Sequence, residues 1–453
     1  MKPRNFSRVA LTVAFASLLP AFASNEIPPP KQAKPLLITG ATLHTVSGAS
    51  IPDGRMLVDQ GRIVAIGTAA NVPDRPGADV VNLKGKHVYP GFIAANTAMG
   101  LAEVSSVRAT VDVTETGPLN PNARALVAVN ADSELIPVAR ANGVLAALSV
   151  PRAGPTGLIG GTSAVIQLDG WTWEEMAIER EAGLHVFLPS MRSPGAQNPQ
   201  LLPQRLEEMQ RVTQSRLRAL EEAFESAAAY AKAVAADDKI ERDARWEAMR
   251  SVFPAPSGKQ RTVFVHADDA GQIRHALGFA ERFGLKIVIV GGMDAPHLAP
   301  LLKAKDVPVI VAGLHRLPTR RNDPPETPFA IPARLHAAGV KFVIARAGAA
   351  FDAARERSLP FEAGTAVAHG LPRDQALRAI TLGAAEVLGV ADRLGSLEAG
   401  KLANFFVTDG DPLEIRTQVE RVYVQGRELP LTDKQTRLRD KYEERYRQLG
   451  AQK

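Results

Sequence analysis

Histidine offers varied chemistry near neutral pH, and this sequence has nine histidines and no cysteine. The missing cysteines exclude thiol catalysis and cysteine-ligated metal sites. His266 directly follows a predicted strand at 262–265, so it is well placed for a site at a strand end, although a hydrogen bond to Asp268 or to a neighbouring strand would explain it more simply. The other eight show no H-x-H or H-x-x-x-H spacing and are expected to be surface or hydrogen-bonded core residues: His44, His87, His185, His275, His297, His315, His336 and His369.

Arg346 stands at the end of another predicted strand, at 341–344. Its guanidinium carries a permanent positive charge and suits a carboxylate or phosphate ligand. A structural ion pair to Asp268, Asp269 or Asp294 is the simpler interpretation of this residue.

The elements that would position these side chains alternate between strands and helices from residue 89 to residue 394, as βαβ units do. Roughly 300 residues of this alternation fit a (β/α)8 TIM-like barrel better than an open sheet. The predicted strands lie at 88–93, 144–150, 164–168, 262–265, 286–290, 307–311 and 341–344. The predicted helices lie at 271–283, 295–305, 331–338 and 373–388.

Two segments that flank the barrel, 36–88 and 395–430, consist of short apolar runs separated by turns that contain glycine. The turn Asp59-Gln60-Gly61, for example, separates two such runs and predicts a hairpin. We expect the two segments to pair with each other into one small β-sandwich domain.

Two helical stretches carry many charges. Residues 201–250 mix Leu, Met and Ala with Glu and Arg at helical spacing, which predicts a helical insertion in the barrel. The C-terminal segment 431–453 contains a predicted charged helix at 433–448, expected to be solvated rather than a nucleic-acid arm.

The first 23 residues have the layout of a secretory signal peptide, with a basic start, an apolar run at 9–19 and the small-x-small sequence Ala21-Phe22-Ala23. The run is too short to span a bilayer, so no membrane span is expected after cleavage. The proline-rich residues 24–35 are expected to form a flexible mature N-terminus. We therefore expect an exported protein, either periplasmic or secreted.

The charge balance argues against nucleic acid as a partner. The net charge is +6, and Lys2, Arg4 and Arg8 belong to the predicted signal peptide. The remaining charge of about +3 is too small for the basic surface that nucleic-acid binding needs.

Three parts of the sequence together resemble the amidohydrolase superfamily, and within it the imidazolonepropionase-like branch: residues 61–67 with 85–93, residues 157–176, and residues 383–404. The resemblance implies a distorted (β/α)8 barrel that binds zinc or another divalent metal and hydrolyses carbon–nitrogen bonds in amides, lactams or related groups. It also implies that Gly160-Gly161-Thr162-Ser163, which lacks a Walker lysine, forms a loop near the barrel mouth.

The same resemblance implies metal ligands that this sequence does not supply. Asn96 and Ala98 stand where the family has an H-x-H pair, Gly291 stands at a histidine position, and Ala347 stands at an aspartate position. His266 is the one retained ligand. A catalytic zinc needs about three protein ligands and an open position for water, so we expect no metal cofactor.

Two hypotheses follow. In the first, the protein is an inactive amidohydrolase homologue that binds a small molecule at a barrel mouth formed by His266, Arg346, Asn96 and Asp268. This protein could also pair with an intact amidohydrolase or form a homo-oligomer.

In the second hypothesis, the protein is an active hydrolase of carbon–nitrogen bonds with a non-standard site around His266. Asp268, Asp269 or Asp112 would then be the metal ligands or the general base.

Overall fold

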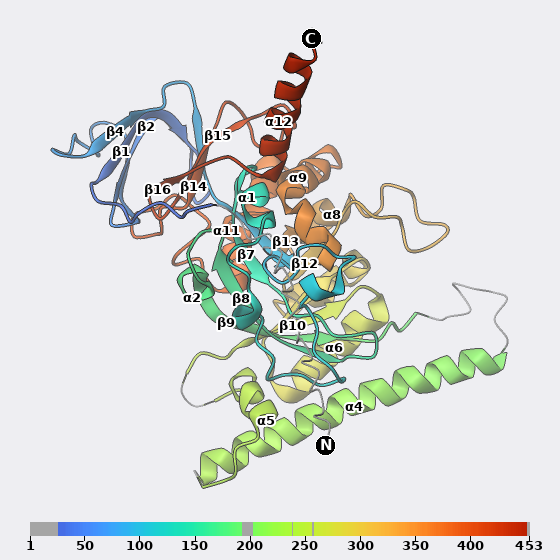
Figure 1. Cartoon of the computed structure of the whole chain (residues 1–453). Helices are drawn as coiled ribbons and strands as arrows, with labels where there is room; N and C mark the ends of the chain where they lie inside the picture. The colour runs from blue at the N-terminus through green and yellow to red at the C-terminus, as the bar shows by residue number, and fades with distance from the viewer. Residues whose placement is uncertain (1–25, 193–202, 238, 256–257, 451–453) are drawn as a thin grey trace, which may run out of the picture.

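The computed structural model describes residues 26–192, 203–237, 239–255 and 258–450, and the predicted signal peptide lies outside these residues. Figure 1 shows a β domain beside a larger α/β body, with a long helix along the lower edge of that body. No helix in the described ranges is both long and apolar enough to cross a membrane.

The first sheet combines strands from both ends of the described chain. Its order is β16-β15-β14-β5-β1-β2-β3, with β4 beside β1. The antiparallel pairing of β14 with β5 joins the C-terminal strands to the N-terminal ones. The strands are β1 (Leu36–Leu43), β2 (Ile51–Asp59), β3 (Arg62–Gly67), β4 (Asp79–Asn82), β5 (His87–Pro90), β14 (Phe405–Thr408), β15 (Val419–Val424) and β16 (Arg427–Leu429).

The predicted hairpin of this sheet is confirmed. Gln60 and Gly61 connect β2 to β3 with φ angles of 50° and 76°, the left-handed conformation that a two-residue type I′ turn requires. The described residues before β1, 26–35, contain no helix or strand, yet Gln32 accepts a hydrogen bond from the Gly61 amide at 2.9 Å and donates one to the Val58 carbonyl at 3.0 Å.

The second sheet has eight strands in sequence order from β6 to β13 and curves into a nearly closed barrel. At the seam, the Asn96 side-chain amide of β6 donates to the carbonyl of Arg346, directly after β13, at 3.0 Å. The strands are β6 (Phe92–Thr97), β7 (Val144–Ser149), β8 (Ile159–Gln167), β9 (Ala177–Phe187), β10 (Thr262–Ala267), β11 (Ile287–Gly291), β12 (Val309–Ala312) and β13 (Phe342–Ala345).

The barrel departs from the expected parallel arrangement at β8, which runs antiparallel to both β7 and β9. The connections on either side of β8 contain about nine residues each, whereas a parallel crossover needs a dozen or more. Strand β9 is not among the strands predicted from the sequence. The expected loop at Gly160-Gly161-Thr162-Ser163 was wrong, because these residues lie within the buried strand β8.

Helices cover the outside of the barrel. The α-helices are α1 (Leu135–Arg140), α2 (Trp173–Met176), α4 (Pro203–Ala236), α5 (Ala244–Met249), α6 (Ala270–Phe283), α7 (Ala299–Ala304), α8 (Ile331–Ala338), α9 (Leu359–Ala368), α10 (Arg373–Ala379), α11 (Leu382–Leu388) and α12 (Lys434–Gln448). The 3₁₀ segments are η1 (Arg108–Thr110), η2 (Ala125–Ala128), η3 (Arg250–Val252), η4 (Ala295–Leu298) and η5 (Ala350–Ser358).

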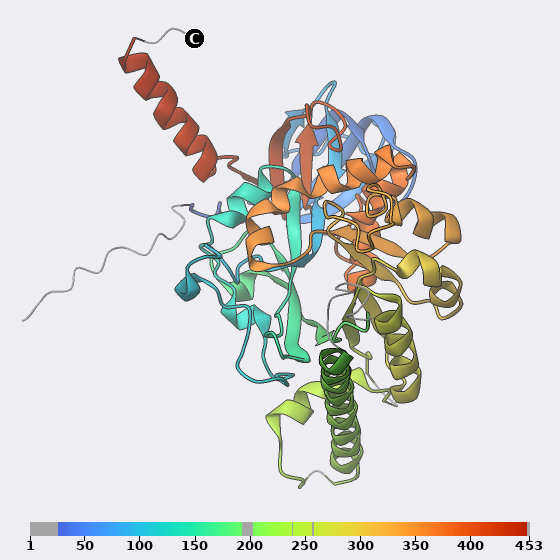
Figure 2. The same cartoon turned by 90° about the vertical axis from the view of Figure 1, so that its right-hand side faces the viewer.

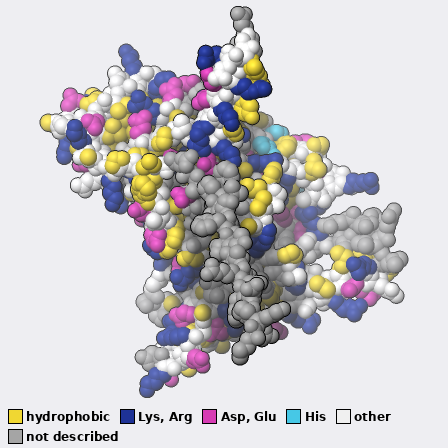
Figure 3. Space-filling view, viewed as in Figure 1, with side chains coloured by type: hydrophobic (Ala, Val, Ile, Leu, Met, Phe, Trp, Pro, Cys, Tyr) yellow, Lys and Arg dark blue, Asp and Glu magenta, His cyan; other side chains and the backbone are white. Residues whose placement is uncertain are grey.

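Two helices extend beyond the body. The buried residues of α4 all lie between Leu220 and Val234, so its first half is exposed, as Figures 1 and 2 show. Helix α12 buries no residue and projects from the opposite end of the molecule. Figure 3 shows apolar and basic side chains along this projecting helix.

The barrel interior is filled by alternate residues of the strands. Phe264 of β10 packs there with Ile93, Ala146, Val288 and Val343 from other strands. Because side chains alternate along a strand, His266, two residues after Phe264, projects to the same side one layer nearer the carboxyl end of β10. We call the region at the carboxyl ends of β6, β7, β9, β10 and β13 the barrel mouth.

Candidate functional site: the barrel mouth

His266 is hydrogen-bonded to another histidine. Its Nε2 lies 2.9 Å from Nδ1 of His185, which projects from the neighbouring strand β9. On its other side, the Phe187 ring stacks on the imidazole of His266, with 3.9 Å between ring centroids. Of the two simpler interpretations, the hydrogen bond to a neighbouring strand is confirmed, and no bond to Asp268 is present among the described contacts of His266.

Both imidazoles favour the neutral form. Burial lowers the pKa of His266 well below its usual range, and the nearby His185 and Arg152 lower it further. Burial likewise lowers the pKa of His185 to about 3, again with a smaller contribution from Arg152. One imidazole therefore donates to the other, so the facing nitrogen of His266 is occupied.

Arg152 brings a positive charge to this pair. It follows β7, and its guanidinium lies over the Phe187 ring at 5.4 Å from the centroid. Burial lowers the pKa of Arg152, with an opposing effect from the Asp352 carboxylate. Its buried Nη1 has no hydrogen-bond partner within the described part of the chain. A buried guanidinium N–H without an acceptor is costly, so the group is suited to an acceptor from outside the chain.

Arg346 pairs through both terminal nitrogens with carboxylates of the chain itself, while its buried Nε has no hydrogen-bond partner among the described residues. Its Nη1 forms a buried ion pair with Glu362 of α9, and its Nη2 lies 3.5 Å from Asp352 of η5. Glu362 also accepts a hydrogen bond from the Leu314 amide at 2.6 Å. The predicted structural ion pair of Arg346 is confirmed. Its predicted partners were wrong, because Arg346 pairs with Glu362 and Asp352 and with none of the three predicted aspartates.

A third carboxyl group lies beside this cluster. Glu356 of η5 is completely buried, and burial raises its pKa to about 8, while Thr97 and Arg346 lower it by less. Neither of its oxygens accepts a hydrogen bond of ordinary geometry from the described residues. At neutral pH the Glu356 carboxyl group is therefore mostly protonated.

Asp268 lies at the end of β10 but turns to a different partner. It forms a two-pronged ion pair with Arg316, at 3.0 and 2.9 Å. Asp269 is the N-cap of α6 and accepts hydrogen bonds from the amides of Gln272 and Met191 at 2.8 and 2.9 Å. Asp112, on an exposed loop, has no recorded contact with the histidine pair in the described structure.

The positions that the resemblance associates with metal are occupied differently. Asn96 uses its amide at the barrel seam, and Ala98 is buried among small apolar side chains. Gly291 has a φ of 113°, and a Cβ there would lie 2.7 Å from the Asp268 carboxylate. Ala347 contributes no donor atom beyond its backbone. Together with the occupied Nε2 of His266, these side chains do not fit a divalent metal.

The described residues contain no group of three or more His, Cys, Asp or Glu side chains able to hold a metal ion. Within the described residues, the mouth instead offers two guanidinium groups with an unpartnered N–H, Nη1 of Arg152 and Nε of Arg346, together with two neutral imidazoles and a neutral carboxylic acid. Such a set can donate hydrogen bonds to an acid or a carbonyl group.

Three residues of this site were missed or set aside in the sequence. His185 was classed as a core or surface residue, and Arg152 and Glu356 were not singled out. The signal for His185 was available in Gly183-Leu184-His185-Val186-Phe187, whose buried apolar alternation marks a strand. Arg152 and Glu356 lie outside the strands and carry no comparable pattern.

Known proteins resemble this chain mainly in fold. Residues 346–430 match the amidohydrolase family. An amidohydrolase from Thermotoga maritima MSB8 is 27% identical, with a TM-score of 0.74 over 87% of this chain and 99% of that one. No curated protein matches the sequence.

Two enzymes with lower identity share the fold. Phenylurea hydrolase B is 16% identical with a TM-score of 0.54, covering 88% of this chain and 97% of its own. Molinate hydrolase is 15% identical with a TM-score of 0.52, covering 88% and 95%. The family match at residues 346–430 and the likeness to the Thermotoga protein identify the architecture as that of amidohydrolases, a nearly closed eight-stranded barrel with a second sheet.

Proposed function

We propose that this protein is a non-hydrolytic member of the imidazolonepropionase-like branch of amidohydrolases, exported from the cytoplasm, that binds a small acid at its barrel mouth without a metal. The observation that carries the proposal is the guanidinium of Arg152. Its Nη1 is buried and has no acceptor in the described chain, and it lies above Phe187 and the histidine pair. A carboxylate would supply the missing acceptor.

The rest of the mouth supports binding over hydrolysis. Water activation in this fold needs a metal or a free base, and the one retained histidine has its Nε2 occupied by His185. Arg346 faces the carboxylates of Glu362 and Asp352, so neither acid is available to hold a cation. A neutral Glu356 would donate a hydrogen bond to a ligand oxygen instead of accepting a proton.

An N-acyl amino acid is a suitable probe because it carries both a carboxylate and a cleavable amide. N-acetylglycine would be followed by proton NMR, in which line broadening reports binding and free acetate reports hydrolysis. Arg152→Gln should weaken the broadening by roughly tenfold in apparent affinity. Arg334→Gln, on the exposed side of α8, is the matched control and should behave as the parent protein.

Elemental analysis of protein expressed with excess zinc completes the experiment. We expect far less than one metal per chain and no acetate above the rate in buffer. A stoichiometric metal that supports acetate release would refute the proposal. It would favour the alternative, an active hydrolase of carbon–nitrogen bonds with a site around His266. If N-acetylglycine shows the same line broadening with Arg152→Gln as with the parent protein, the proposal of a small-acid site at Arg152 is refuted.

Self-association is a second candidate function, favoured by one feature of α12. Leu438, Tyr442, Tyr446 and Leu449 are 43%, 49%, 53% and 65% exposed and lie on one face of this projecting helix. An exposed stripe of this kind suits pairing with the same helix of a second copy. Tyr442→Asp should then lower the mass measured by light scattering from a dimer to a monomer, whereas Lys441→Asp should not.

A further inference from the structure

A cavity of about 1370 Å³ lies on the outside of the barrel wall, far from the residues of the mouth described above. It is enclosed by α4, α5 and the residues that follow α5 on one side, and by β8, β9 and the start of β10 on the other. None of Arg152, His185, His266 or Arg346 lines it. Its volume exceeds that of an ordinary small-molecule pocket, so a ligand with an extended body can enter.

The cavity exists because the helices present alanine to it. Ala228, Ala231 and Ala235 of α4 follow one another at helical spacing, and Ala244 and Ala248 of α5 face the same space. Methyl groups leave the gap between helix and barrel unfilled, while larger side chains at these positions would close it.

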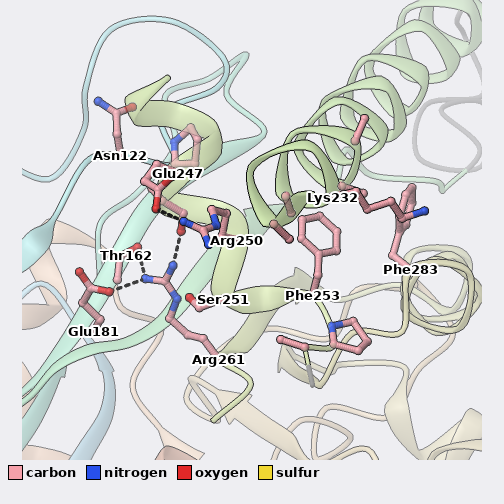
Figure 4. Close-up of a pocket in the computed structure, with 18 of the residues that line it drawn as sticks. Asn122, Thr162, Glu181, Lys232, Glu247, Arg250, Ser251, Phe253, Arg261 and Phe283 are labelled. Atoms are coloured by element: carbon pink, nitrogen blue, oxygen red, sulfur yellow. Dashed lines mark hydrogen bonds and ion pairs between the residues drawn. The ribbon is translucent and has the colours of Figure 1, made fainter. Parts of the chain in front are cut away.

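One end of the cavity is aromatic. Phe253 and Phe283 line it, and Figure 4 shows the Lys232 side chain extending beside the Phe283 ring. Within the described ranges, Lys232 forms no ion pair. This end therefore offers apolar surface with an exposed ammonium group at its edge.

The other end is basic. Arg261 and Arg124 share a single carboxylate, that of Glu181, at 3.0 and 3.5 Å. The Arg261 side chain is 8% exposed, and its Nε has no hydrogen-bond partner among the described residues, although its other nitrogens bond to Thr162 and to the carbonyl of Ala248. Two guanidinium groups on one carboxylate leave a net positive charge at this end.

A second cluster nearby also has more arginines than carboxylates. Glu247 faces two arginines, Arg250 at 2.6 Å and Arg242 at 3.2 Å. Figure 4 shows the Arg250–Glu247 pair of the helical side and the Arg261–Glu181 pair of the barrel side near each other in that view, with Phe253 and Phe283 farther away. The polar wall as a whole thus has more cations than anions, which favours an anionic head group.

We propose that this cavity binds an amphipathic carboxylate, with its head group at Arg124 and Arg261 and its apolar body along the alanine face toward Phe253 and Phe283. The site is distinct from the barrel mouth, so the two assignments can fail independently. Charge complementarity at one end and unfilled apolar surface at the other both point to this class of ligand.

Decanoate below its micelle concentration is the probe, measured by calorimetry on the full-length protein. Ala231→Phe places a phenyl ring on the alanine face, where the apolar body would lie, and should weaken decanoate binding by tenfold or more, on the order of a fully lost apolar contact. Ala233→Phe, on the same helix but exposed and outside the cavity lining, is the matched control and should bind as the parent protein.

The head group is tested separately. Arg124→Gln alters a side chain that is 63% exposed, so the fold should tolerate it. This substitution should weaken the binding of decanoate by roughly threefold to tenfold and leave the binding of decanol unchanged. Circular dichroism melting of each variant checks folding. Absence of decanoate binding, or equal binding to Ala231→Phe and Ala233→Phe, would overturn the proposal, as would equal losses of decanoate and decanol in Arg124→Gln.

Discussion

Glu356 gives the barrel mouth a measurable pH dependence. This carboxyl group is completely buried, and folding raises its pKa from an ordinary value near 4.5 to about 8. Between these two values the folded state binds more protons than the unfolded state. The free energy of unfolding must therefore fall as the pH rises through this range.

The size of the effect follows from the two pKa values. Each pH unit well inside the range removes about 1.4 kcal/mol, which corresponds to one proton difference between the two states. From pH 6.5 to pH 8, Glu356 should lower the free energy of unfolding by roughly 1.5–2 kcal/mol. Histidines with lowered pKa values act in the opposite direction, because in the unfolded state they lose protons near pH 6.5 and each raises stability by about 0.4 kcal/mol over this interval. The effect of Glu356 is therefore the difference between the parent protein and a variant that lacks this carboxyl group.

Glu356→Gln removes the titrating group and retains its shape. Urea unfolding of the parent protein and this variant should be compared at pH 6.5 and 8.0 at one ionic strength. Between the two pH values, we expect the free energy of unfolding of the parent to change by about 1.5–2 kcal/mol less favourably than that of the variant. Glu207→Gln, an exposed substitution on α4, should leave the pH dependence of the parent unchanged. Parallel pH profiles for the parent and Glu356→Gln would refute the burial argument.

Three further outcomes follow from the same structure. Glu362→Gln leaves the Arg346 guanidinium buried without its main counterion and should lower the free energy of unfolding by about 3 kcal/mol, measured by urea denaturation. Below neutrality, burial lowers the pKa of His44 to about 4, so the unfolded state binds more protons, and stability should fall as the pH drops from 6.5 toward 4. Gly291→Ala forces a side chain into a left-handed conformation against Asp268 and should reduce thermal stability by a few degrees, roughly 1–2 kcal/mol.

Sequence patterns predicted the elements whose ends are set locally. Helix α8 spans the predicted residues 331–338, with Pro332 in its first turn and the left-handed Gly339 at its end. Helix α12 follows Asp433, which caps it through the amide of Thr436. Signals of this kind act within a few residues, so they can be recognised without knowing the tertiary structure.

The direction of β8 and the existence of β9 depend on longer-range pairing. Strand β9 begins with Ala177-Ile178-Glu179-Arg180-Glu181, a polar stretch that resembles the end of a helix more than a buried strand. Its place is fixed by its neighbours β8 and β10, the latter being separated from it by the whole helical insertion. Tertiary contacts decide such segments, and local propensity does not record them.

For the same reason, the contacts of the barrel mouth could not be predicted from the sequence. His185 and His266 are 81 residues apart, and their pairing requires that β9 and β10 be adjacent and in a particular register. Arg346 finds its counterions in η5 and α9, which follow it in the chain, whereas the predicted partners lie at the ends of β10 and β11. The sequence predicted that Arg346 would pair with carboxylates, but which carboxylates lie next to it depends on the tertiary structure.

Under the proposal of a metal-free mouth, Gly291 indicates that the backbone, and not only the side chains, differs from that of a metal site. A Cβ at this position would meet the Asp268 carboxylate at 2.7 Å, and Asp268 cannot move aside freely because Arg316 holds both of its oxygens. A histidine placed at 291 would therefore need a different backbone, and breaking the Asp268–Arg316 pair would expose further unpaired charge. Restoring ligand side chains one position at a time should consequently lower stability before it raises metal affinity, which is the behaviour expected if the backbone itself has adapted to binding without a metal.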